Sequence, residues 1–110
     1  MTAPIIHIVD DDRSYRTSVS RLVEAASFRS ACYESATEFL ERLPIQGPGC
    51  VLLDLQMPGL SGLELQDRLA QAAPLLPVVF LTGHGNVEVI VRAMKAGAED
   101  FLEKSAPGER

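Results

Sequence analysis

Short apolar runs alternate along this chain with segments in which apolar residues recur every three or four positions. Runs of the first kind are typical of buried strands, and the second spacing is typical of amphipathic helices. One run, Cys50–Leu53, is apolar at every position, which favours a central parallel strand covered on both faces. We expect five strands, at Ile5–Val9, Phe28–Tyr33, Cys50–Leu53, Pro77–Leu81 and Ala98–Leu102.

Four helices are expected between these strands. Ser35 and Ser61 each stand three residues before a glutamate, the spacing of a capping box that opens a helix. Strands that alternate with helices in this way predict an α/β fold with a parallel sheet and right-handed crossovers. The expected helices run over Ser14–Ala26 with Tyr15 in the apolar stripe, from Ser35 through Leu43 to a stop at Pro44, from Ser61 through about Ala73, and from a cap at Asn86 to a stop at Gly97.

Length, composition and charge narrow the class of protein. The chain has 110 residues, enough for one domain, and its 46% hydrophobic content argues against general disorder. A net charge of −5 disfavours a nucleic-acid surface, which is normally basic. No signal-peptide pattern and no apolar run of membrane-spanning length is visible, so we expect a cytoplasmic protein without a membrane segment. Cys32 and Cys50 lack metal-site spacing, and both are expected to be small buried thiols.

Polar residues follow the ends of the predicted strands. Asp10 and Asp11 end the first strand, Asp54 the third, Thr82 the fourth and Lys104 the fifth. In an open parallel sheet, ligands bind beyond the carboxyl ends of the strands, which meet at one edge. The sequence therefore predicts that three acids, a hydroxyl and a lysine lie together at that edge.

This group of side chains suits phosphoryl chemistry. Carboxylates that share a pocket repel one another unless a cation lies between them, and short aspartate side chains with room for water and phosphate favour Mg²⁺. Lys104 can hold a phosphoryl oxygen as a point charge, and Thr82 can donate a hydrogen bond to another. Asp54, alone on the central strand, can act as a nucleophile toward phosphorus. Asp12 points away from the pocket by strand phase and is interpreted as a cap or first-turn acid of the first helix.

Three stretches carry a family resemblance over nearly the whole chain: HIVDDD, VLLDLQMPGLSGLEL and VVFLTGHGNVEVIVRAMKAGAEDFLEK. They resemble the receiver domain of two-component response regulators, and the last is especially similar to FixJ-type transcription regulators. The resemblance implies a flavodoxin-like, doubly wound parallel sheet of five strands in the order 2-1-3-4-5. It also implies a single receiver domain over residues 1–110, with the fifth helix missing, and a signalling domain instead of an enzyme.

The resemblance also implies roles for individual positions. Asp54 would accept a phosphoryl group from a partner histidine kinase. Asp10 and Asp11 would form the acidic pair, with Asp11 favoured as the direct Mg²⁺ ligand, and the backbone carbonyl of Gln56 would complete the metal site. The remaining positions are Thr82 as the switch hydroxyl, Phe101 as the switch aromatic and Lys104 as the phosphate-binding lysine.

Two departures from the family leave its behaviour open. Ser105 follows Lys104 where the family has proline, commonly after a cis peptide, and we expect a trans bond here because a non-proline cis bond is costly. Without a fifth helix, we expect a homodimer through the fourth helix and fifth strand, or an exchange of elements between two chains. DNA binding would need an output domain absent from this sequence. His84, between two glycines, is either an exposed loop residue or a border of the site that tunes hydrolysis with Gln56.

Two other functions remain as alternatives. A degenerate receiver would act as a protein-interaction module without phosphorylation. The absent fifth helix and the Ser105 departure favour this alternative, and the complete acid set disfavours it. A small aspartate-nucleophile phosphatase fits Asp10-x-Asp12 after the first strand. That class is disfavoured by the short chain without a cap domain and by Arg13 and Ser14 at the start of the first helix.

Overall fold

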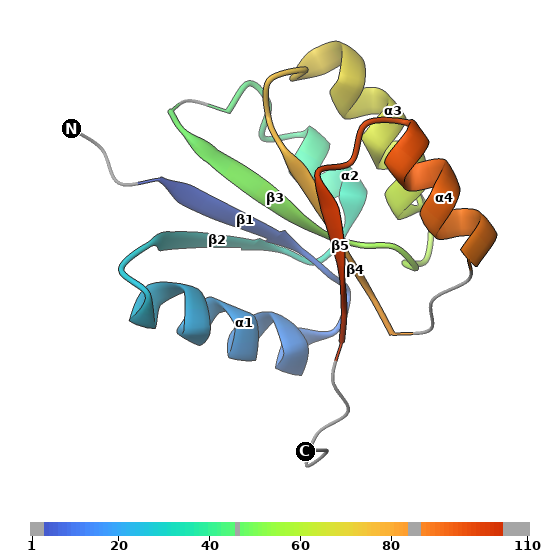
Figure 1. The fold of residues 1–110 in the computed structure, drawn as a ribbon. Helices are drawn as coiled ribbons and strands as arrows, with labels where there is room; N and C mark the ends of the chain where they lie inside the picture. The colour runs from blue at the N-terminus through green and yellow to red at the C-terminus, as the bar shows by residue number, and fades with distance from the viewer. Residues whose placement is uncertain (1–3, 46, 84–86, 105–110) are drawn as a thin grey trace.

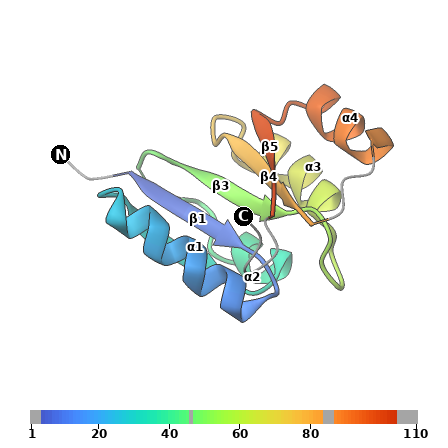
Figure 2. The ribbon, with the colours of Figure 1, turned by 60° about the horizontal axis from the view of Figure 1, so that its bottom comes forward.

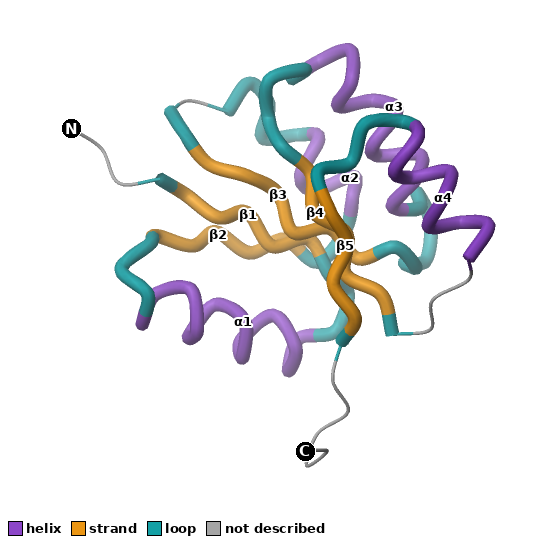
Figure 3. The backbone as a smooth tube through the Cα atoms, in the orientation of Figure 1, coloured by secondary structure: helices purple, strands orange, loops and turns teal. Residues whose placement is uncertain are grey.

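A five-stranded parallel sheet forms the centre of the molecule, with strands in the order β2-β1-β3-β4-β5. The structure is a computed structural model, and it describes residues 4–45, 47–83 and 87–104. Figures 1 and 3 show the sheet as one layer, with α1 on one side and α2, α3 and α4 on the other. The α/β class and the predicted strand order are therefore confirmed. The elements are β1 (Ile5–Val9), α1 (Arg13–Ala25), β2 (Arg29–Tyr33), α2 (Ala36–Leu40), β3 (Gly49–Asp54), α3 (Gly62–Ala72), β4 (Val78–Thr82), α4 (Val87–Lys95) and β5 (Asp100–Glu103).

The helix starts follow their caps. Ser61 and Glu64 form the predicted capping box at α3, in which each side chain accepts a hydrogen bond from the other residue's backbone N–H. Ser35 accepts from the N–H of Glu38, but the Glu38 carboxylate accepts from the N–H of Glu34, so only half of the predicted box forms. The Asn86 cap lies outside the described residues.

Helix α2 is shorter than the sequence predicts and ends at Leu40. The N–H groups of Arg42 and Leu43 donate to carbonyls three residues back, at 3.0 Å and 3.2 Å, so the last turns tighten after the helix. Pro44 disfavours helical backbone at Leu43, the residue before it. The helix therefore ends at Leu40, three residues before the end that the sequence predicts.

The core lies mainly between the sheet and the α2–α4 layer. Phe39, Leu65 and Leu69 from the helices pack with Val51 and Leu53 of β3, and all of these are buried. On the other face α1 has no fully buried residue, which leaves a thinner layer there.

Two predictions about burial are wrong because of this thin layer and the sheet edge. Leu52 of β3, on the α1 side, is only half-buried, so the central strand is not fully covered on both faces. Cys32 is exposed because β2 is an edge strand that pairs only with β1, whereas Cys50 is half-buried. In the part of the chain that the structure describes, no helix is long and apolar enough to cross a membrane.

Candidate functional site

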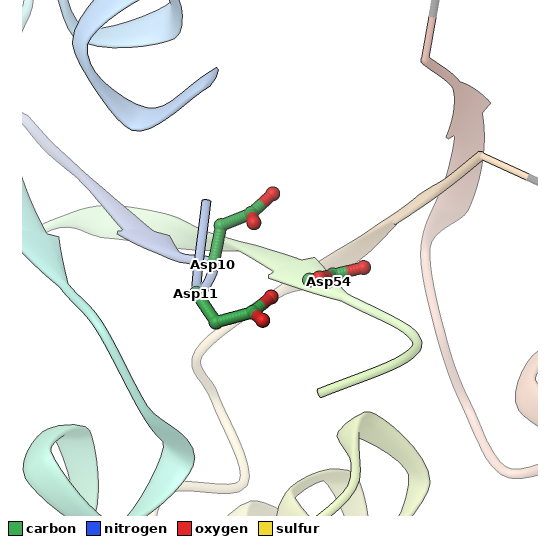
Figure 4. A group of neighbouring side chains, drawn as sticks. All are labelled: Asp10, Asp11 and Asp54. Atoms are coloured by element: carbon green, nitrogen blue, oxygen red, sulfur yellow. The ribbon is translucent and has the colours of Figure 1, made fainter. Parts of the chain in front are cut away.

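The predicted acids meet where β1 and β3 end. Val9 pairs with Leu53, so the residues that follow in the two parallel strands are neighbours, and Figure 2 shows the two strand tips side by side. Asp10, Asp11 and Asp54 each offer a carboxylate oxygen within 4.8 Å of the others. Figure 4 shows these side chains grouped around a common space. The topology therefore brings together residues that are 44 positions apart in sequence (10 to 54).

Lys104 reaches the same pocket from the end of β5. Its Nζ lies 2.7 Å from Asp10 Oδ2 and 3.5 Å from Asp54 Oδ1. The backbone N–H of Lys104 donates to the carbonyl of Thr82 at 2.8 Å, which continues the pairing of β5 with β4 beyond the strand. A single ammonium group thus faces two buried carboxylates and is closer to Asp10.

Backbone groups fix the turn between β1 and α1. Asp10 accepts a hydrogen bond from the N–H of Asp12 at 2.9 Å, and its carbonyl accepts one from Nη1 of Arg16 at 2.7 Å. The Asp12 carboxylate accepts from the N–H of Tyr15 at 3.2 Å and is the N-cap of α1, as predicted for this acid. These bonds tie the first turn of α1 to the acidic pocket.

Close packing holds α3 near the pocket as well. A Cβ atom on Gly62, the first residue of α3, would lie 2.5 Å from the carbonyl oxygen of Asp54. Only glycine permits this approach without a backbone shift. The segment between β3 and α3 therefore turns back tightly beside the phosphoacceptor candidate.

Burial and like charge make the pocket electrostatically unbalanced. Desolvation, followed by repulsion from Asp10, raises the pKa of Asp54 to about 6, although Lys104 and the Gln56 N–H at 3.2 Å oppose this shift. Desolvation disfavours the charged form of Lys104, but its hydrogen bond and attraction to Asp10 and its attraction to Asp54 outweigh this and raise its pKa. Three carboxylates with one ammonium leave negative charge that a cation would neutralise.

The remaining predicted site residues lie around this pocket. Thr82 is 2% exposed, and its Oγ1 has no hydrogen-bond partner among the described residues. Phe101, on β5, is 38% exposed and therefore faces outward in this structure. Gln56 is exposed, and its N–H contacts Asp54. The predictions for His84 and Ser105 fall outside the described residues.

Two residues of α1 belong to the site although their sequence pattern did not indicate it. The Tyr15 ring centroid lies 4.5 Å from Nζ of Lys104, and Arg16 holds the Asp10 carbonyl. The helical spacing places Tyr15 in the apolar stripe of α1. Its position, three residues after the capping aspartate, was the only signal that it faces the strand ends.

The oxygen ligands fit a hard divalent cation. Aspartate carboxylates with open positions for water and phosphate suit Mg²⁺, which keeps several waters in most protein sites. The three clustered carboxylates are the residues that could hold such an ion, and the ion would relieve their repulsion. Lys104 and the buried Thr82 lie at the ends of the neighbouring strands β5 and β4, at the same edge of the sheet.

Comparison with known proteins identifies a family that agrees with this fold and with the acid cluster. A family model described as "Response regulator receiver domain" matches residues 6–110. The chain is 44% identical over 106 residues to the transcriptional regulatory protein FixJ of Bradyrhizobium diazoefficiens, covering 96% of this chain and 51% of that protein. It is 42% identical over 100 residues to the response regulator protein TmoT of Ectopseudomonas mendocina, covering 91% and 46%. The chain thus spans about half the length of the curated relatives it matches.

Solved structures agree with the fold. Full-length FixJ from B. japonicum superposes with a TM-score of 0.86 at 42% identity, covering 99% of this chain and 53% of that one. A CheY-like receiver domain protein from Methanospirillum hungatei JF-1 gives a TM-score of 0.87 at 25% identity, covering 96% and 84%. The strand order and the acid cluster agree with these matches. The chain therefore belongs to the receiver domains of two-component response regulators.

Proposed function

We propose that this receiver domain accepts a phosphoryl group on Asp54 from a partner histidine kinase, with Mg²⁺ as the cofactor. The observation that carries this proposal is the contact of Lys104 with both Asp10 and Asp54 inside the acid cluster. An exposed surface cluster would not need such a contact, because solvent would screen its charges.

The metal would be held by the carboxylates of Asp10, Asp11 and Asp54 and by the backbone carbonyl of Gln56. When bound, Mg²⁺ supplies charge neutralisation for the phosphoryl oxygens. The exposure of Asp11 leaves the metal side of the pocket open to solvent and to the phosphodonor.

The chain's own residues supply the nucleophile and its positioning. A carboxylate oxygen of Asp54 attacks phosphorus, the bond from phosphorus to the kinase imidazole nitrogen breaks, and the electron pair stays on that nitrogen. The attacking form is the ionised one, and a pKa of about 6 leaves most Asp54 ionised at pH 7. Lys104, 3.5 Å from Asp54, binds one transferred oxygen and balances part of the added charge.

The response would then pass to the surface formed by α4 and β5. Thr82, buried without a hydroxyl partner among the described residues, would donate its hydrogen to a phosphoryl oxygen, and Phe101 would move inward behind it. This surface carries several exposed apolar side chains, which suit a homodimer or an exchange of elements between chains. They are Val87, Val91, Met94, Phe101 and Leu102.

The direct test is incubation with Mg²⁺ and a small phosphodonor, followed by intact mass measurement. We expect one phosphoryl group on the parent and none on Asp54→Asn, with Asp67→Asn on the exposed face of α3 as the matched control. A parent that stays unmodified would favour the degenerate-receiver alternative. Phosphate release lost in Asp10→Asn but kept in Asp54→Asn would favour the phosphatase.

Light scattering after size exclusion tests the assembly, with and without the phosphodonor. We expect the dimer fraction to rise on phosphorylation, and Val91→Glu to prevent that rise because it places a charge in the apolar contact. Glu88→Gln, on the first turn of the same helix, is the matched control. A monomer under all conditions would contradict the dimer while leaving phosphorylation of Asp54 untouched.

A further inference from the structure

Lys104 has a third neighbour in the pocket, and it is an aromatic ring. Its Nζ lies 4.5 Å from the ring centroid of Tyr15, within the range of a cation–π contact. Among the described residues, the carboxylates of Asp10 and Asp54 are the other neighbours of this ammonium group. The lysine therefore lies among two acids and one aromatic face.

The lysine needs such a support because its own strand provides little. All four residues of β5 are exposed, and Lys104 follows that strand on a flexible four-carbon stem. The carboxylates alone would favour Asp10, since Asp10 is 2.7 Å from Nζ and Asp54 is 3.5 Å away. An ammonium drawn fully to Asp10 would be withdrawn from the group that receives the phosphoryl.

Tyr15 can act as a fixed support because the first turn of α1 is anchored. Its N–H is bound by the Asp12 carboxylate at 3.2 Å, and the Asp12 N–H is bound by Asp10 at 2.9 Å. The next residue, Arg16, donates to the carbonyl of Asp10 at 2.7 Å. The backbone that carries the ring is thus tied to the same acid that binds the lysine. Tyr15 is also partly buried, which strengthens its attraction for the cation by excluding water.

We propose that Tyr15 is a positioning residue for phosphoryl transfer, whose ring holds the Lys104 ammonium within reach of Asp54. This inference rests on the proposed phosphorylation of Asp54. When the lysine exchanges its contact with Asp10 for a phosphoryl oxygen, the ring contact can persist, because it joins the ammonium group to the ring and not to a carboxylate. The ring face, and not the hydroxyl, supplies this contact, so phenylalanine should replace tyrosine and an aliphatic residue should not.

The first test compares initial rates of Asp54 phosphorylation by a small phosphodonor with Mg²⁺. A partly desolvated cation–π contact predicts a rate about three- to tenfold lower in Tyr15→Leu. Tyr15→Phe should stay within about twofold of the parent, because it keeps the aromatic face. Phe28→Leu is the matched control, since Phe28 is also a partly exposed aromatic but follows the far end of α1. It should react at the parental rate.

The outcomes separate this inference from the proposed function. A parent that takes up no phosphoryl group contradicts the proposed function itself. A parent that is phosphorylated, with Tyr15→Leu folded and reacting equally fast, overturns only the role of Tyr15. Equal slowing by Tyr15→Phe and Tyr15→Leu would also overturn it, because the ring would then not be the active feature.

A second measurement works even if Tyr15→Leu fails to fold. The chain has two tyrosines and no tryptophan, so Tyr15 is the only emitting side chain of interest in a Tyr33→Phe background. In the Tyr33→Phe background, the substitution Lys104→Met removes the ammonium group but keeps a side chain of similar length. We expect the tyrosine emission intensity to change, whereas Lys95→Met at the end of α4 should leave it unchanged. Identical emission in the parent background and Lys104→Met would show that the ring contact is absent in solution and overturn the proposal.

Discussion

Two buried polar clusters, one within strand β1 and one just beyond its end, respond to burial in opposite ways. Three residues before the acidic pocket, His7 is 3% exposed and its Nδ1 lies 3.0 Å from the hydroxyl of Tyr33. The Tyr33 and Phe39 rings meet edge to face, with centroids 4.9 Å apart. We call these three residues the His7 corner. The second cluster is the acidic pocket of Asp10, Asp54 and Lys104.

Burial favours the neutral form of a titratable side chain in both clusters. Only the His7 corner can be neutral throughout, because the acidic pocket contains Lys104 and its carboxylates. Desolvation lowers the pKa of His7 and raises that of Asp54. In the His7 corner, His7 Nδ1 and the Tyr33 hydroxyl share one hydrogen bond among aromatic rings, while His7 Nε2 has no partner among the described residues. A neutral imidazole carries this at a lower cost than a charged one would. The pocket instead keeps several charges around one lysine. The His7 corner therefore avoids buried charge, while the pocket keeps a cost in stability that the proposed metal and phosphoryl group would use.

The largest expected effect comes from removing the aromatic wall of the His7 corner. Phe39 is fully buried, so Phe39→Ala should lower the free energy of unfolding by about 3–5 kcal/mol, through lost burial and a cavity. Chemical denaturation measures this change. Leu75→Ala is the control, since Leu75 is 94% exposed and its loss should change stability by less than about 0.5 kcal/mol. A loss near 1 kcal/mol for Phe39→Ala would mean that the corner repacks easily.

The next largest effect is stabilisation of the fold by Mg²⁺. It should depend on the residues of the acidic pocket and not on those of the His7 corner. Mg²⁺ that binds only the folded state adds about 2.7 kcal/mol at a hundredfold excess over its dissociation constant. Thermal unfolding in Mg²⁺, compared with Na⁺ at equal ionic strength, measures it. Asp11→Asn should remove most of the difference. Asp12→Asn should keep it, because asparagine caps a helix as well as aspartate does. A parent that does not respond would contradict the metal site.

A smaller effect of the same sign, a stabilisation, is expected from neutralising the pocket without metal. The folded pKa of Asp54 is about 6 against an ordinary value of 3.8, so its ionised form destabilises the fold at pH 7. Asp54→Asn should raise the free energy of unfolding by about 1–3 kcal/mol, reduced by the lost attraction to Lys104. Denaturation at pH 7 without Mg²⁺ checks this, and Asp67→Asn on the exposed face of α3 should have no such effect. A destabilised Asp54→Asn would show that Lys104 already balances the pocket.

The smallest effect is a pH dependence from the His7 corner. The pKa of His7 in the folded protein lies below the ordinary value of 6.5. Above pH 6.5 its imidazole is therefore mostly neutral in both the folded and the unfolded protein. As pH falls below 6.5 the unfolded chain binds the proton first, so stability declines, by at most about 1.4 kcal/mol per pH unit. Asp54 has the opposite slope, because its raised pKa makes stability fall as pH rises from 3.8 to about 6.

The two slopes can be separated by working in the Asp54→Asn background. Unfolding measured there between pH 5.5 and 7.5, a window of about one unit on either side of the histidine value, should show declining stability on acidification. Adding His7→Leu should flatten this dependence. An unchanged slope after that substitution would mean that His7 titrates normally and that the corner tolerates a charged imidazole.

The local sequence pattern determined the secondary structure of this protein and much of its candidate site. Apolar runs and helical spacing identify the five strands and four helices of the described residues, because most of these elements have an apolar face that packs against the rest of the fold. The capping box at Ser61 is equally local, since its hydrogen bonds join residues within one turn. The acid cluster could also be predicted, because the carboxyl ends of parallel strands share one edge and the last residue of a strand must therefore lie there.

Only the tertiary structure decided how the side chains share these places. The edge position of β2 exposes Cys32, although its sequence neighbours suggest burial. Several contacts that define the two clusters join different elements. They are the unequal contacts of Lys104 with Asp10 and Asp54, the contact of the Tyr15 ring with Lys104, and the hydrogen bond between His7 and Tyr33. Sequence periodicity gives the face of an element but not its rotation and height against its neighbours. Contacts of a few ångströms between elements depend on those two quantities, which packing of the whole core fixes.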